Sequence, residues 1–202
     1  MDKNIIVAGV GGQGSILASH IIAEAAIKAG EKKKEQINVR VGETFGAAMR
    51  GGAVASHIRI GDVYGPLVGK GKADLVLALE PLEGLRIGVD YLSDGGTVIL
   101  NTQPLPPVDV KTGAAKYPPI DVIMDCLQKL CGKVVVLDAI KLALEAGNAK
   151  TVSVVMLGAA YASGILMVER ETLLEAIKER VPQKTLEVNI RAFELGEQAF
   201  CS

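Results

Sequence analysis

A glycine-rich turn that joins a strand pattern to a helix pattern constrains this chain more than any other feature. Residues 4–10 are apolar and β-branched, as expected for a buried strand. The sequence GVGGQG at residues 9–14 closes this run, and residues 15–29 then place apolar side chains at helical spacing. Gly30 is the predicted end of this helix. A strand, a glycine turn and a helix in this order are typical of α/β folds, in which ligands bind at the carboxyl ends of strands.

Strand and helix patterns alternate along the rest of the chain. Strands are predicted at residues 36–41, 53–60, 73–79, 97–100 and 133–137, and residues 63–68 could form a short returning strand. Helices are predicted from residue 80 onward and at residues 121–130, 138–146, 151–164, 169–180 and 185–200. The proline-rich residues 102–119 are predicted to be a loop or an extended crossover. The alternation predicts a three-layer, Rossmann-like α/β fold, with helices on both faces of a mostly parallel sheet.

Composition excludes several classes of protein. The 202 residues are 49% hydrophobic and 22% charged, which fits one globular domain covering residues 1–202. A formal net charge of −1 and an aromatic content of 3% argue against a nucleic-acid binder. Residues 151–168 carry no charge but contain many small side chains, so they are predicted to form a buried core helix and not a membrane span.

Neither the cysteines nor the histidines form a recognisable metal or catalytic pattern. Cys126, Cys131 and Cys201 cannot supply the four ligands that a structural zinc ion or an iron–sulfur cluster usually takes. They indicate a reducing compartment and inert thiols, and with no secretion signal at the start of the chain they predict a cytoplasmic protein. His20 and His57 are predicted to have packed or capped structural roles, so no catalytic or metal-binding residue is assigned.

The glycine turn has two open interpretations. Gly11, Gly12, Gln13 and Gly14 could let backbone N–H groups approach a phosphate at the positive end of a helix. A dinucleotide site of this type usually adds an acid about 20 residues further on, whereas here the acid after the second strand is Glu43, 29 residues after Gly14. The alternative is that the glycines only make a tight turn, although a polar side chain such as that of Gln13 is well placed to meet a ligand or a partner.

A second glycine cluster, at residues 42–52, lies between two predicted strands. Arg50 precedes Gly51 and Gly52, and its planar guanidinium suits a phosphate or a carboxylate. Glu43 could pair with Arg50 or with a partner residue, while the simpler alternative for both side chains is a solvated loop position. We expect this cluster and the glycine turn to emerge at the same edge of the sheet if their strands are neighbours.

Several separated motifs together resemble a known family. These are GVGGQG at 9–14, MRGG at 49–52 and ADLVLALEPLE at 73–83, followed by VMLGA at 155–159 and by Asn189, Ala192-Phe193 and Gly196. In this order they are similar to the gamma-type component of 2-oxoacid:ferredoxin oxidoreductases. The segment EPLE at 80–83 looks most like the beta subunit of indolepyruvate:ferredoxin oxidoreductase. The resemblance covers essentially the whole chain.

The resemblance implies one subunit of a larger enzyme. Such complexes oxidatively decarboxylate a 2-oxoacid with coenzyme A, giving an acyl-CoA, CO2 and reduced ferredoxin. It implies that thiamine diphosphate and [4Fe–4S] clusters are held by partner subunits and not by this chain, with ferredoxin as a further partner and no nucleic acid or membrane involved. Gly11 to Gly14, Glu43 and Arg50 to Gly52 would then form an edge of the assembled active site, facing the partner and the path of coenzyme A. A stand-alone NAD- or FAD-binding oxidoreductase and a non-catalytic scaffold are the alternatives.

Overall fold

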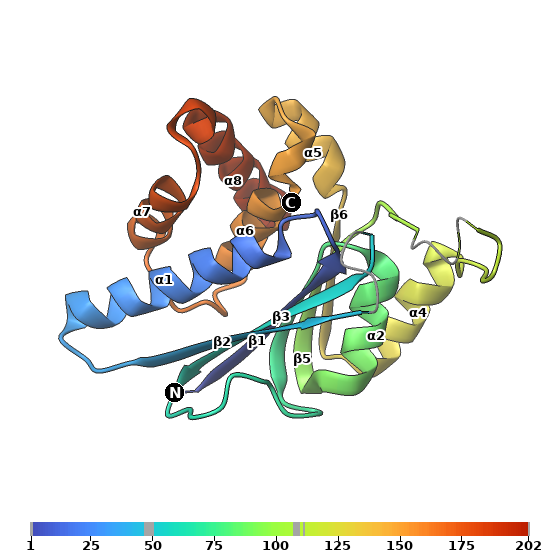
Figure 1. The fold of residues 1–202 in the computed structure, drawn as a ribbon, viewed down its shortest axis with the longest axis horizontal. Helices are drawn as coiled ribbons and strands as arrows, with labels where there is room; N and C mark the ends of the chain where they lie inside the picture. Colours follow the sequence, from blue (N-terminus) through green and yellow to red (C-terminus); the bar gives the residue numbers. More distant parts are fainter. Residues whose placement is uncertain (1, 47–50, 107–109, 111, 202) are drawn as a thin grey trace.

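Six strands form one mixed sheet in the computed structural model, which describes residues 2–46, 51–106, 110 and 112–201 (Figure 1). The strands are β1 (Lys3–Val10), β2 (Asn38–Phe45), β3 (Ala53–Gly61), β4 (Ala73–Ala78), β5 (Leu92–Asn101) and β6 (Lys133–Leu137). The helices are α1 (Ser15–Lys33), α2 (Pro81–Tyr91), α4 (Ile120–Leu130), α5 (Ala139–Ala146), α6 (Val152–Ala162), α7 (Arg170–Arg180) and α8 (Leu186–Cys201), with short 3-10 turns at Ala149–Thr151 and Gln183–Thr185. The predicted α/β fold is confirmed.

The sheet order is β2-β3-β1-β4-β5-β6, and the neighbouring strands from β1 to β6 are parallel. Strand β3 is antiparallel to both β1 and β2. The sheet is therefore mixed at one side. The reason is the length of the connection: only residues 46–52 join β2 to β3, and a parallel pair would need a crossover of about a dozen residues or more, so the two strands pair as an antiparallel hairpin.

Helices cover both faces of the sheet and form the outer layers (Figure 1). Helices α1, α5, α6, α7 and α8 pack on the face that presents Ile5, Val7 and Ile58. Helices α2 and α4 pack on the opposite face, against Ile6 and Ala8. Alternate residues of one strand thus enter two separate apolar clusters, as the period of a strand requires.

The uncharged stretch near residue 155 forms the buried helix α6, as predicted. The backbones of helices α6 and α8 are in direct contact where they cross, and a glycine lies at each of the two contact points. A Cβ at Gly158 would lie 2.0 Å from the Phe193 carbonyl oxygen, and one at Gly196 would lie 1.8 Å from the Val155 carbonyl oxygen. Only glycine allows backbones to approach so closely. Among the described residues, no helix is both long enough and apolar enough to span a membrane.

Several predicted boundaries are wrong, among them the start of β5, which is Leu92 and not residue 97. Helix α1 continues past Gly30 to Lys33 and ends at Lys34, whose left-handed backbone donates its N–H to Glu31 O and Gly30 O. Strand β2 runs to Phe45 instead of ending near residue 41. Residues 63–68 form no strand but cross the sheet as a loop, and a Cβ at Gly42 would lie 2.9 Å from Pro66 Cβ.

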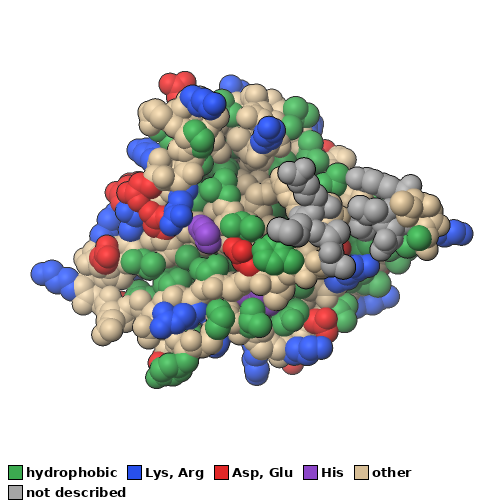
Figure 2. Space-filling view, in the orientation of Figure 1, with side chains coloured by type: hydrophobic (Ala, Val, Ile, Leu, Met, Phe, Trp, Pro, Cys, Tyr) green, Lys and Arg blue, Asp and Glu red, His purple; other side chains and the backbone are tan. Residues whose placement is uncertain are grey.

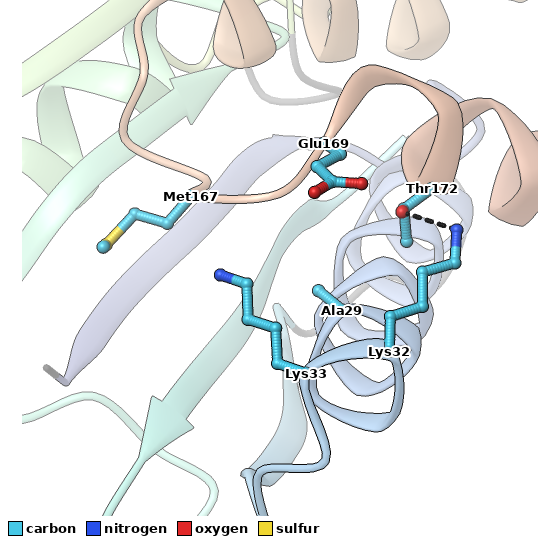
Figure 3. A pocket seen from close by; sticks show the side chains of 6 residues that line it. All are labelled: Ala29, Lys32, Lys33, Met167, Glu169 and Thr172. Atoms are coloured by element: carbon cyan, nitrogen blue, oxygen red, sulfur yellow. Dashed lines mark hydrogen bonds between the residues drawn. The ribbon is translucent and has the colours of Figure 1, made fainter.

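The charged end of α1 contacts helix α7. Lys32 Nζ donates to Thr172 Oγ1 at 2.9 Å and lies 3.0 Å from Glu175 Oε2. Figure 3 shows Lys32 directed toward Thr172, while Lys33 extends on the other side of a small cavity that Met167 and Glu169 also line. Tertiary contact with α7 thus accounts for the extra helical turn beyond Gly30.

Candidate binding site at the glycine loops

The two glycine-rich segments meet, as the sequence predicted. Their strands β1 and β3 are neighbours, and Val10 pairs with Ala53 at the end of the ladder. Directly beyond that pair, the Gly11 N–H donates to the Gly52 carbonyl oxygen at 2.9 Å. Gly12 and Gly51 have φ of 105° and 70°, a left-handed region that favours glycine. The two segments therefore form one continuous surface at the carboxyl end of β1, while Arg50 lies outside the described residues.

Gln13 uses its side chain to fix the loop. Its Oε1 accepts from the Val10 N–H at 2.8 Å, and its Nε2 donates to the Leu79 carbonyl oxygen at 3.1 Å. Both ends of the amide are thereby engaged by the backbone of the chain itself. The predicted contact between Gln13 and a ligand stays a prediction, since the structure shows the side chain joining β1 to the end of β4.

Asn101 extends this connection to the next strand. Its Nδ2 donates to Leu79 O at 2.9 Å, and its Oδ1 accepts from the Ala139 N–H at 3.1 Å. The side chain is fully buried at the end of β5. Gln13 and Asn101 thus link the carboxyl ends of β1, β4 and β5 to the start of helix α5. The strand predicted at residues 97–100 carries no sign of this network.

Gly14 is the N-cap of α1 and faces helix α6. Its φ is 87°, and a Cβ built on it would lie 2.6 Å from the Ser153 hydroxyl oxygen. Ser153 is buried, and none of the described residues is a hydrogen-bond partner for its Oγ. The N-terminus of a 19-residue helix carries positive partial charge, so this end of α1 favours an anionic group near Gly12 to Gly14.

Glu43 occupies a different position from the one predicted. It lies within β2, opposite Ser56, and not in the loop after the strand. Its side chain faces that of His20, with 3.7 Å between His20 Nε2 and Glu43 Oε1. Figure 2 shows hydrophobic side chains gathered across the centre of one face of the molecule. Ile16 and Phe45 are both partly open to solvent. Pairing of Glu43 with Arg50 involves a residue outside the described ones and stays a prediction.

A buried acidic group beyond the glycine loops was missed by the sequence analysis. Glu80, fully buried at the N-cap of α2, accepts from the Glu83 N–H at 2.9 Å and from Tyr117 Oη at 2.5 Å. Burial, followed by the bond to Glu80, raises the pKa of Tyr117 above its ordinary value. Burial also raises the pKa of Glu83. The signal was present in EPLE, since two acids directly after an apolar strand pattern imply at least one carboxylate at a helix start.

His57 has the environment of a packed residue. It is 1% exposed, its Nδ1 accepts from the Val68 N–H at 3.3 Å, and its ring meets the ring of Tyr91 edge-on at 5.3 Å. Burial lowers its pKa, which favours the neutral ring. In the part of the chain that the structure describes, no three His, Cys, Asp or Glu side chains come together as a potential metal site.

The fold and the joined glycine loops define the class of protein. The chain matches the model of the pyruvate ferredoxin/flavodoxin oxidoreductase family over residues 4–199, and it belongs to this family. The resemblance read from the motifs is thereby confirmed.

Individual relatives agree with that membership. Indolepyruvate oxidoreductase subunit IorB of Thermococcus kodakarensis is 44% identical over 200 residues, covering 98% of this chain and 96% of that protein. The IorB subunit of Methanothermobacter thermautotrophicus is 43% identical over 196 residues, covering 97% of this chain and 96% of that protein. Among solved structures, the gamma subunit of a keto/oxoacid ferredoxin oxidoreductase from Geobacter sulfurreducens superposes with a TM-score of 0.69 at 28% identity, covering 98% of both chains.

Proposed function

We propose that this chain is the subunit of an indolepyruvate:ferredoxin oxidoreductase that does not bind thiamine diphosphate. The observation that carries the proposal is the pair of glycine loops joined by the bond from Gly11 to Gly52, in a chain similar along its whole length to IorB subunits. The assembled enzyme would convert an aryl-pyruvate and coenzyme A to an acyl-CoA and CO2, passing two electrons to ferredoxin. The three cysteines, which form no framework of disulfide pairs, support a cytoplasmic enzyme.

The redox cofactors would be held by companion subunits. Cys126 lies in α4, and Cys131 follows that helix with its Sγ donating to Leu127 O. Thiamine diphosphate and [4Fe–4S] clusters supply the carbanion and electron-transfer chemistry in such enzymes, and the protein orients the reactants. The cysteines described here do not provide a set of cluster ligands, so we assign no step on these groups to this chain.

This chain would contribute electrostatics at one edge of the active site. The N-terminus of α1 and the exposed backbone at Gly12 present positive charge at the carboxyl end of β1. We propose that this edge, with Arg50, Gly51 and Gly52, lies along the path of coenzyme A, whose phosphates suit N–H donors and a guanidinium. Glu43 would help to orient this edge through His20 or through a residue of the partner.

A stand-alone dinucleotide-binding enzyme is supported less well. In a dinucleotide fold, the acid that binds the ribose ends the strand next to the glycine strand. Here β3 lies between β1 and β2, so Glu43 is on the outermost strand and is paired with His20. The geometry therefore favours the subunit role over a dinucleotide-binding enzyme. A non-catalytic scaffold would have the same fold, but its glycine loops would only dock the partner subunit.

Reconstitution separates these functions. The chain is co-expressed with a companion thiamine-binding subunit, and the complex is assayed for indolepyruvate-dependent reduction of ferredoxin. We expect activity only when both chains are present, and Arg50→Ala should raise the concentration of coenzyme A needed for half-maximal rate. Lys116→Ala, a change of one exposed cation far along the sequence, is the control. Turnover by this chain alone would rule out the subunit role. Unchanged kinetics in Arg50→Ala would rule out the proposed contact with coenzyme A and would favour a scaffold role for the loops.

A further inference from the structure

A cavity of about 150 Å³ lies between the β2–β3 hairpin and helix α2, on the side next to the glycine loops. The hairpin contributes Thr44, Phe45, Gly46 and residues 53–55, and the helix contributes Glu83 and Ile87. Pockets for whole small molecules usually measure about 300–1,000 Å³. This cavity therefore has room for one ring system and not for an entire cofactor.

Glu83 supplies the one carboxylate among the described residues that line this cavity. The residue is 4% exposed, and its only hydrogen bond with another described side chain is a long one from Arg86 Nη1, at 3.5 Å. The Arg86 side chain is itself 61% exposed, so water screens its charge and weakens its attraction to Glu83. Glu83 is itself nearly inaccessible to water and consequently retains acceptor capacity, and a buried acceptor of this kind favours a ligand that brings a donor.

The remaining wall is apolar and includes an aromatic ring. Phe45 is 53% exposed, in a chain with three phenylalanines, of which Phe193 is fully buried in the core. Ile87, Val54 and Ala55 complete the apolar lining. Aromatic side chains pack well against other flat rings, in offset or edge-on arrangements. A planar ligand thus suits these walls better than an extended aliphatic one.

We propose that this cavity binds a flat aromatic ring that carries an N–H donor, with Glu83 as the acceptor and with Phe45 and Ile87 packed against the ring. The inference rests on the proposed function and deepens it, since the indole ring of an aryl-pyruvate substrate is such a group. The adenine of coenzyme A has the same chemistry and is the second source. The cavity would then select the aryl group of the substrate from within a subunit that performs no chemistry itself.

The test titrates the full 202-residue chain with indole, 1-methylindole and adenosine. The chain contains no tryptophan, so indole fluorescence reports binding without interference. We expect indole to bind about tenfold more tightly than 1-methylindole, which lacks the N–H donor. Glu83→Met should weaken indole binding about tenfold and leave the binding of 1-methylindole unchanged. Asp90→Met, which also replaces a carboxylate with methionine but at an exposed position of α2, is the matched control and should bind all three ligands like the unaltered chain.

Equal affinity for indole and 1-methylindole would overturn the proposal, and this comparison needs no variant to fold. Absence of indole and adenosine binding would overturn it too. Binding of adenosine without indole would keep the ring site and assign it to coenzyme A. A reconstituted complex that turns over indolepyruvate while the chain binds neither ring would refute this inference alone. Indole binding by a chain that never supports activity would instead refute the proposed function.

Discussion

Gln13 and Asn101 donate to the same oxygen, the carbonyl of Leu79, at 3.1 and 2.9 Å. Gln13 lies in the turn after β1 and Asn101 is the last residue of β5, and both reach the residue that directly follows β4. A backbone carbonyl has two lone pairs, and here both are used by side chains. The shared acceptor fixes the spacing of β1, β4 and β5 where the glycine loop leaves the sheet.

Asn101→Ala should lower the free energy of unfolding by about 1–3 kcal/mol, because it leaves the buried Ala139 N–H without its acceptor. Urea denaturation followed by circular dichroism measures this change. Gln128→Ala, at an exposed position of α4, is the control and should stay within about 0.5 kcal/mol of the unaltered chain. Equal stability of both variants would contradict a structural role for Asn101.

Gly158→Ala and Gly196→Ala should each destabilise the protein by about 1–3 kcal/mol or more, because the added methyl group would overlap backbone atoms of the facing helix. Thermal unfolding of the purified variants gives the comparison. Gly69→Ala is the control, since its Cβ would find an ordinary contact at 3.6 Å from Lys72 Cγ. A midpoint for Gly158→Ala as high as that for Gly69→Ala would show that α6 and α8 are farther apart than described.

Gly14→Ala should cost about 1–2 kcal/mol of backbone strain from its left-handed φ, plus the overlap with Ser153 Oγ. Ser153→Ala alone should be nearly neutral, since none of the described residues hydrogen-bonds to the lost hydroxyl. In the double variant the overlap is reduced and the strain remains, so the two changes should be less than additive. Strict additivity in denaturant titrations would mean that Gly14 and Ser153 are not in contact.

His57 should make the stability depend on pH. Burial lowers its pKa in the folded state below the ordinary value of 6.5, so the unfolded chain binds the proton more readily. Stability is then retained above pH 6.5 and falls as the pH drops from 6.5 toward the folded-state pKa. His57→Gln should remove this part of the pH dependence, whereas His20→Gln, at the second of the two histidines, should keep it. Denaturant midpoints between about pH 5 and 8 distinguish the two outcomes.

The regular part of the fold could be predicted because its signals are local. Apolar runs such as residues 73–79 and the uncharged helix near residue 155 report burial directly, and the alternation of Ile58 and His57 assigns both faces of β3. The end of α1 could not be predicted in this way. Gly30 has a local preference to stop the helix, but contacts from Lys32 to α7 continue it for three more residues.

The parts of the candidate site that contain glycine motifs could be predicted from the sequence. The hydrogen bonds between residues far apart in the sequence could not. The meeting of Gly11 with Gly52 follows from neighbouring strands. The bonds from Tyr117 to Glu80 and from Gln13 to Leu79 join residues 37 and 66 positions apart, and no spacing rule connects them. Glu43 was misplaced because the strand extends beyond a glycine, at Gly42, that looked like its end.

The bond from the Gly11 N–H to the Gly52 oxygen involves no side chain, and this determines how the site can vary. Side-chain substitutions that leave the course of the backbone unchanged would leave this bond intact, whereas alanine at Gly12 or Gly51 would strain the left-handed backbone on which that course depends. Loss of the amide hydrogen itself, through proline or an ester at position 11, would remove the donor of this bond. The contact between the two loops thus depends on the course of the backbone and not on a contact made by any side chain.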